Sequence, residues 1–120
     1  RVLFRSKQDS ALEAGVTVVN GIGDSDSEIL HTLLESTDLI IDAILGIGSS
    51  RAITAPISTI TFAAIESGVP VVALDLPTGL NSDTGEFDVA GLPADRTLML
   101  GYPKLGAAIR QCGDQSAIQT

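Results

Sequence analysis

The sequence predicts an α/β protein built around a mostly parallel sheet, and three observations lead to that fold class. Short apolar runs alternate with stretches whose apolar residues recur at helical spacing, as in strands joined by crossover helices. Aromatic residues make up 3% of the chain, so its 44% hydrophobic content is mainly aliphatic, which suits layers of strands and helices. Two apolar runs also place an acid near their end and a glycine four residues after it, at Asp42 and Gly46 and at Asp75 and Gly79, as strands do at the ligand-binding edge of such sheets.

Size and charge narrow the class of protein further. At 120 residues the chain has the size of one domain, so we expect residues 1–120 to form a single domain. The lone Cys112 has no internal disulfide partner, which favours a reducing compartment, the cytoplasm. A net charge of -8 argues against a nucleic-acid partner, and no apolar run approaches the ~20 residues that cross a membrane.

The N-terminal part is predicted as strand, helix, strand and helix. Val2-Leu3-Phe4 predicts a short strand, residues 6–14 predict a helix that stops at Gly15, and Val16-Thr17-Val18-Val19 predicts a second strand. Apolar residues then recur at helical spacing, so residues 26–36 should form an amphipathic helix capped by Ser25 or Asp26.

Two buried strands flank the next predicted helix. Residues 38–45 are nearly continuous in apolar side chains, which predicts the central strand of the sheet, buried on both faces. Pro56 suits the first turn of a helix that Gly68 ends, and residues 70–76 predict the second buried strand. One face of that helix should carry the apolar side chains Ile57, Ile60, Ala64 and Ile65.

The C-terminal part begins with a long connection. Residues 77–95 contain too many Pro, Gly, Asn and Asp residues for a helix, and loops of that length are usually functional or mobile. Residues 96–101 predict the last strand, residues 104–110 a short helical turn, and the remainder a polar tail.

The two strand ends carry the candidate site. Asp42 and Asp75 are one strand-helix-strand repeat apart, so parallel neighbouring strands would bring them to the same carboxyl edge. A carboxylate at Asp42 interrupts an apolar strand and needs either a cation or several hydrogen-bond donors. A buried acid that accepts loop amides explains Asp42 equally well, and Asp75 alone could merely hold the following turn.

The loop after the first of these strands offers a second feature. Gly46-Ile47-Gly48-Ser49-Ser50-Arg51 supplies free backbone amides and a guanidinium, which together could cradle a phosphate. It matches neither a Walker loop nor the glycine fingerprint of dinucleotide dehydrogenases, and a Gly-Ser loop is often a plain connection. Thr78 adds a hydroxyl beside Asp75, in a Pro-Thr-Gly sequence that is also ordinary turn chemistry.

Other chemically interesting residues receive no catalytic role. His31 lies on the predicted amphipathic helix without a partner nearby in sequence, and Lys104 is interpreted mainly as a surface lysine. Three serines lack both a nucleophile-elbow motif and a base: Ser49, Ser50 and Ser82.

These residues resemble the YjeF N-terminal domain, the NAD(P)H-hydrate epimerase family. The family's Asp-Ala-(Leu/Ile)-Leu-Gly-Thr-Gly corresponds to residues 42–48, and its Val-Asp-Ile-Pro-Ser-Gly to residues 74–79. The resemblance extends over about residues 38–110 and includes Pro56-Ile57 and Thr84-Gly85, while residues 1–37 fit by pattern only. It implies a three-layer, Rossmann-like sandwich.

The resemblance also implies an isomerase that interconverts the R and S forms of NADHX or NADPHX, with a potassium ion as cofactor. Asp42 and Thr78 match the potassium ligands, with Thr78 replacing the family's usual Ser, and Asp75 matches the acid beside the reacting ring. The segment that contacts substrate phosphates corresponds to Gly46, Ile47, Gly48, Ser49, Ser50, Arg51 and Ala52. An ADP- or ATP-dependent dehydratase, fused or separate, and a homo-oligomer are the partners it suggests.

One departure from the family pattern concerns the upstream loop Gly-Asn-Gly-Asn-Asn-Gly-Gly-Asp, which this chain lacks. Because that loop completes the site, the chain is either an N-terminally incomplete fragment of an epimerase, which the start at Arg1 rather than Met favours, or a degenerate relative. We expect the 120-residue chain by itself neither to epimerise NADHX nor to bind it well. The alternative function is a non-catalytic ligand-binding or scaffold module of the same fold. An ordinary NAD-dependent dehydrogenase is disfavoured by the absent glycine fingerprint.

Overall fold

The computed structural model describes residues 2–24, 26–46, 51–107 and 117–119. The chain divides into two compact units, Arg1–Leu30 and His31–Thr120. The larger unit contains the sheet and both strand-end acids.

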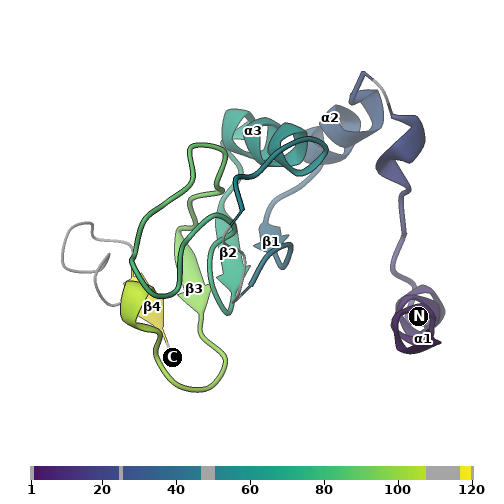
Figure 1. Cartoon of the computed structure of the whole chain (residues 1–120). Helices are drawn as coiled ribbons and strands as arrows, with labels where there is room; N and C mark the ends of the chain where they lie inside the picture. The colour runs from purple at the N-terminus through teal and green to yellow at the C-terminus, as the bar shows by residue number, and fades with distance from the viewer. Residues whose placement is uncertain (1, 25, 47–50, 108–116, 120) are drawn as a thin grey trace. The chain divides into compact units, whose positions relative to one another are not determined.

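Parallel strands form one sheet in the larger unit (Figure 1). In sheet order they are β1 (Ile40–Asp42), β2 (Val71–Leu74), β3 (Arg96–Leu98) and β4 (Ala117–Gln119). Each neighbouring pair of strands is parallel, with Ile40 opposite Val71 in the first pair and Val72 opposite Arg96 in the second. The predicted α/β, Rossmann-like class with a parallel sheet is confirmed.

Helix α3 (Ile57–Ser67) connects β1 to β2. It ends as predicted at Gly68, whose φ of 69° is the left-handed conformation that glycine adopts without a steric penalty. The predicted apolar face is partly wrong, because Ile60 and Ile65 are exposed, whereas Thr61, Ala63 and Ala64 are buried. Small side chains on the inner face allow the helix to lie close to its neighbours.

Two clusters of buried residues form the core of the larger unit. Ala64 of α3 packs with Val71 of β2 and with Leu92, and the Thr61 hydroxyl donates a 2.7 Å hydrogen bond to the Ala90 carbonyl. The second cluster lies beyond the carboxyl ends of the strands and consists of Leu76, Leu80, Met99 and Ala107, with Phe87 packed against it.

The loop predicted for residues 77–95 contains no helix but folds back on itself. Leu80 and Phe87 form an antiparallel bridge, and the Leu92 N–H donates to the Thr78 carbonyl at 2.8 Å. Gly79 has a φ of 98°, and a Cβ there would lie 2.5 Å from the Cα of Gly91. Glycine is therefore required where the two ends of this loop meet.

The predictions for the smaller unit need correction. Helix α1 (Val2–Glu13) begins where a strand was predicted, because a three-residue apolar run fits the first turn of a helix equally well. Residues 16–19 form no strand, and Val16, Val18 and Val19 are exposed. Among its described residues this unit contains no other strand that could pair with them. A short 3-10 helix, η1 (Gly21–Gly23), follows.

Helix α2 (Glu28–Glu35) is shorter than predicted and has a different cap. The Asp24 carboxylate accepts hydrogen bonds from the N–H groups of Ile29 (3.2 Å) and Leu30 (3.1 Å). Asp26 was therefore the wrong choice of cap, and Ser25 lies outside the described residues. An acid at this end of a helix satisfies free N–H groups and interacts favourably with the helix dipole.

The strand predicted for residues 38–45 is shorter and lies at an edge of the described sheet rather than at its centre. Only Ile40–Asp42 forms β1, and the Ile41 side chain is 61% exposed. Continuous apolar sequence indicates a strand but does not fix its place in the sheet order.

The C-terminal part contains one element that the sequence analysis missed. Strand β3 ends at Leu98. Of the helical turn predicted for residues 104–110, residues 105–107 are helical, Lys104 is not, and residues 108–110 lie outside the described residues. The segment predicted as a polar tail contains β4, whose Ile118 pairs with Thr97. A three-residue strand among polar residues has no periodicity from which it could be recognised.

Candidate functional site

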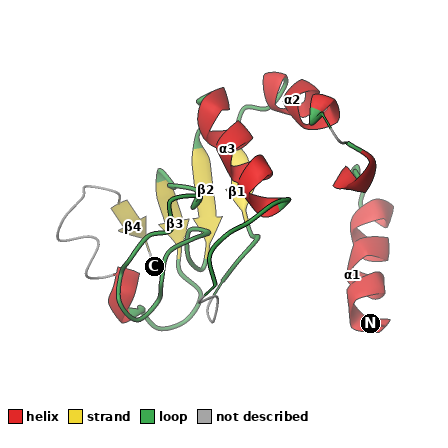
Figure 2. Ribbon diagram, turned by 45° about the horizontal axis from the view of Figure 1, so that its top comes forward, coloured by secondary structure: helices red, strands yellow, loops and turns green. Residues whose placement is uncertain are grey.

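The two acidic strand ends come together at one edge of the sheet, as predicted. Asp42 is the last residue of β1 and lies opposite Ala73 of β2, and Asp75 follows the end of β2 directly. The arrowheads of β2 and β3 mark this carboxyl edge in Figure 2, and loops extend from it. In open α/β sheets such an edge is the usual place for a ligand.

Asp42 and Thr78 form a buried hydrogen-bonded pair. The side chains are 1% and 0% exposed, respectively. The Thr78 hydroxyl donates to Oδ1 of Asp42 at 2.6 Å, and the Thr78 N–H donates to Oδ2 at 2.7 Å. The Thr78 hydroxyl in turn accepts a bond from the Leu45 N–H at 3.1 Å. This pair therefore links the chain segments that leave β1 and β2.

Hydrogen bonds account for the buried charge at Asp42. Besides the two bonds from Thr78, Oδ1 accepts the N–H of Ile44 at 3.2 Å. A carboxylate has about four acceptor positions, so one position remains after these three bonds. The oxygen atoms of Asp42 and Thr78 are of the kind that hard cations bind, and the pair is compatible with a potassium ion.

Asp75 lies in a different environment, with its side chain 21% exposed. Its φ of 70° places a non-glycine residue in the left-handed region, which costs on the order of 1 kcal/mol and is a frequent feature of functional sites. Oδ1 accepts a 2.5 Å hydrogen bond from Nζ of Lys104 and a 3.3 Å bond from the Leu100 N–H. Among the described residues, hydrogen bonds reach only this oxygen of the carboxylate.

The second oxygen of Asp75 faces the start of the predicted phosphate-binding loop. A Cβ built at Gly46 would lie 3.8 Å from Oδ2 of Asp75, so the loop backbone passes close to this carboxylate. Arg51 and Ala52, at the far end of the loop, are exposed. Four of the loop residues proposed to bind substrate lie outside the described residues: Ile47, Gly48, Ser49 and Ser50.

Two residues of the site were missed by sequence reasoning. Lys104, interpreted mainly as a surface lysine, forms the ion pair with Asp75. Asp88 accepts the Ile53 N–H at 3.1 Å and the Ala90 N–H at 2.8 Å, and so connects the segment after Arg51 to the long loop. Asp75, the partner of Lys104, and Ile53, a partner of Asp88, are each distant in sequence from the residue they contact. The only local signal was the turn sequence Gly101-Tyr102-Pro103, which indicates that Lys104 follows the end of a strand.

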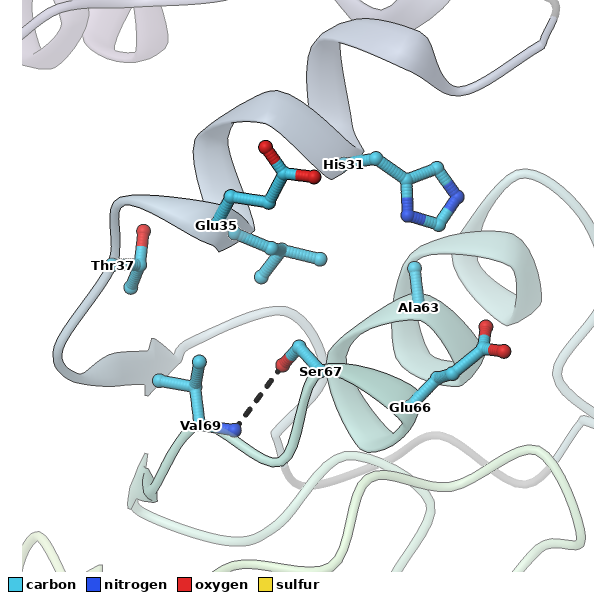
Figure 3. A pocket seen from close by; sticks show the side chains of 8 residues that line it. His31, Glu35, Thr37, Ala63, Glu66, Ser67 and Val69 are labelled. Carbon is cyan, nitrogen blue, oxygen red and sulfur yellow. Dashed lines mark hydrogen bonds between the residues drawn. The ribbon is translucent and has the colours of Figure 1, made fainter.

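A hollow of about 420 Å³ lies elsewhere, between α2 and α3 (Figure 3). His31 and Glu35 of α2 line it together with Glu66 and Ser67 of α3, and Thr37 and Val69 stand before β1 and β2. It is therefore at the opposite end of the strands from Asp42 and Asp75.

In the part of the chain that the structure describes, no group of three acids, histidines or cysteines is placed to hold a metal ion.

Among the described residues, no helix combines the length and the apolar character that crossing a bilayer requires.

Comparison with known proteins connects this geometry to a family. A family model described as "YjeF-related protein N-terminus" matches residues 2–106. An NAD(P)H-hydrate epimerase of Limosilactobacillus fermentum is 40% identical over 79 residues, which are 66% of this chain and 38% of that protein. An NAD(P)H-hydrate epimerase of Rhodopirellula baltica is 38% identical over 100 residues, 82% of this chain and 41% of that protein.

A longer relative shares the same region. The bifunctional NAD(P)H-hydrate repair enzyme of a Synechocystis species is 43% identical over 71 residues, 59% of this chain and 14% of that protein. The chain thus spans less than half the length of each of these relatives.

Proposed function

The chain belongs to the family described as YjeF-related protein N-terminus, and from that membership we propose that its site interconverts the R and S forms of NADHX and NADPHX. The observation that carries the proposal is Asp75, a carboxylate held through one oxygen by a lysine while the other faces the Gly46 loop. The relatives named as epimerases, at 38% and 40% identity, support the same activity.

The reaction requires a group that moves a proton at the hydroxyl of ring carbon C6. We propose that Oδ2 of Asp75 takes this proton. The C6=O double bond then forms while the C6–N1 bond breaks, and the electron pair of that bond stays on N1. N1 finally receives the proton back from Asp75. Rotation about the C5–C6 bond and the reverse steps give the other epimer, with no atom gained or lost. Loss and return of the hydroxyl as water is the alternative, and it also needs a proton from this carboxyl group.

The loop after β1 is proposed to bind the substrate phosphates. Gly46, Ile47, Gly48, Ser49, Ser50, Arg51 and Ala52 make up this segment. Arg51 is exposed and positively charged in a chain whose net charge is -8, so it provides a local attraction for an anionic dinucleotide.

Potassium is the proposed cofactor, and Asp42 and Thr78 would hold it. After the hydrogen bonds described above, each side chain retains an oxygen lone pair for a cation. Bound potassium would supply positive charge at the carboxyl edge and balance the buried carboxylate of Asp42.

The proposed cellular setting follows from the same family. We place the protein in the cytoplasm, working with an ADP- or ATP-dependent dehydratase that is fused or separate, as the bifunctional repair enzyme of Synechocystis suggests. An assembly of identical chains is compatible with this role. A non-catalytic scaffold is the less favoured alternative, because Asp42 and Asp75 are both retained and the relatives are named as enzymes.

The test supplies one purified epimer of NADHX to the protein as encoded by its gene and follows the appearance of the other by NMR. We expect conversion faster than in an enzyme-free control, and faster in potassium chloride than in sodium chloride. Asp75→Asn keeps the shape of the side chain but removes the base, and should lower the rate about 100-fold or more.

The matched control is Asp83→Asn, which removes an exposed carboxylate from the same long loop and should leave the rate unchanged. No conversion above the enzyme-free rate would reject the proposed activity. Unchanged conversion by Asp75→Asn would remove Asp75 from the mechanism while leaving the activity in place.

A further inference from the structure

We propose that Lys104 is a positioning residue of this site, which fixes the Asp75 carboxylate so that Oδ2 faces the substrate. The inference rests on the proposed epimerase function and adds a residue to it. Lys104 follows β3 and lies 29 residues after its partner along the chain.

The contacts of Lys104 are those of a partly buried ammonium group held by two acceptors rather than those of a freely exposed lysine. Its side chain is 15% exposed, and Nζ donates to Oδ1 of Asp75 at 2.5 Å and to the Leu100 carbonyl at 2.9 Å. Two acceptors on different segments leave the ammonium little rotational freedom.

The backbone on both sides of Lys104 is anchored. Met99 and Ala107 are buried in the same cluster as Leu76, the residue that follows Asp75. The Gly106 N–H donates to the Ser82 carbonyl at 2.7 Å, and a Cβ at Gly106 would collide with the Asn81 carbonyl oxygen. The lysine therefore lies on a turn that is anchored on both sides and packed against the exit of β2.

The carboxylate needs such support because its own backbone is unusual. Asp75 has a φ of 70°, and its N–H donates to the Leu98 carbonyl at 2.7 Å, so β3 holds the main chain while Lys104 and the Leu100 N–H hold Oδ1. A carboxylate fixed through one oxygen presents the other in a constant direction, here toward Gly46. Proton transfer depends steeply on such orientation.

The test compares Lys104→Met, Lys104→Arg and Lys104→Ala in the epimerisation assay, using the protein as encoded by its gene. We expect Lys104→Met to lower kcat about 100-fold with little change in KM, because substrate still binds while the carboxylate is misplaced. Lys104→Arg, which can still donate to a carboxylate, should recover much of that loss. Added methylammonium should partly restore Lys104→Ala.

The control is Lys7→Met, which removes the other lysine of the chain, an exposed one, and should behave as wild type. Full kcat in Lys104→Met would overturn the inference and leave the epimerase function standing. The inference would also be overturned if all three Lys104 variants lost thermal stability equally and neither arginine nor methylammonium restored activity, because that result would indicate a role in packing alone. A wild-type protein without epimerase activity would reject both proposals.

Discussion

At the scale of single residues, Thr78 makes more hydrogen bonds within the site than its sequence, which is that of an ordinary turn, would predict. Its side chain and N–H provide two of the three bonds that satisfy the buried Asp42 carboxylate, and its hydroxyl also accepts the Leu45 N–H. Its carbonyl accepts the Leu92 N–H. One residue thus connects β1, the exit of β2 and the end of the long loop.

Replacing Thr78 by Val should therefore destabilise the protein with almost no change in volume. The loss of the hydroxyl leaves a carboxylate oxygen with one donor fewer and the Leu45 N–H unsatisfied, so we expect the free energy of unfolding to fall by about 2 to 4 kcal/mol. Urea denaturation measures this difference. Thr78→Ser keeps the hydroxyl and should lose much less, whereas equal losses for the two variants would assign the effect to packing of the methyl group.

At the scale of elements, the long loop after β2 is hydrogen-bonded to the end of the segment that we propose to bind phosphate. Both oxygens of Asp88 are used: Oδ2 accepts the Ile53 N–H, and Oδ1 accepts the Ala90 N–H. The Asp88 N–H itself donates to the Gly79 carbonyl at 2.9 Å. Asp88 thus helps to hold Ile53, at the end of this segment, from a position 35 residues away in the sequence.

Asp88→Asn should weaken substrate binding more than catalysis. An amide offers only one oxygen, so one of the two N–H groups loses its partner, and the loop that is proposed to bind phosphate becomes less well ordered. We expect KM to rise about 3- to 10-fold with kcat nearly unchanged, as for a loss of uniform binding. Steady-state epimerisation kinetics measure both constants, with Asp83→Asn as the control. A fall in kcat at constant KM would contradict the role of Asp88 in holding this loop.

The elements also show what sequence patterns determine here. The ends of helix α3 were predicted because Pro56 and Gly68 act locally. Strand β2 was predicted from its apolar run, although it is shorter than the predicted residues 70–76. The acids at the ends of β1 and β2 were brought to one edge because parallel topology requires it. These features depend on residues close together in the sequence.

Features that depend on distant partners were not predictable in the same way. Lys104 looks like a surface residue until its turn is packed against Leu76, and the edge position of β1 depends on the order of all strands. The exposed valines of residues 16–19 have strong strand propensity without a strand partner among the described residues of their unit. Propensity alone does not produce a strand when no second strand shares its hydrogen bonds.

At the scale of the whole molecule, two properties oppose each other in controlling self-association. Strand β1 pairs only with β2 among the described strands, and Leu39, Ile41 and Ile44 next to its free edge are 40 to 61% exposed. Such an edge can pair with another chain. The net charge of -8 repels a second copy, and this repulsion is screened by salt.

We therefore expect the 120-residue chain to self-associate reversibly, and more strongly at high than at low sodium chloride, in sedimentation velocity experiments. Ile41→Lys should weaken this association about tenfold, because a charge on an edge strand disfavours further pairing. Val89→Lys is the matched control: it also replaces an exposed apolar residue by lysine, at a loop position that is 96% exposed, and it changes the net charge equally. An equal effect of both variants would show that charge alone governs association, and a monomer at every salt concentration would exclude pairing through β1.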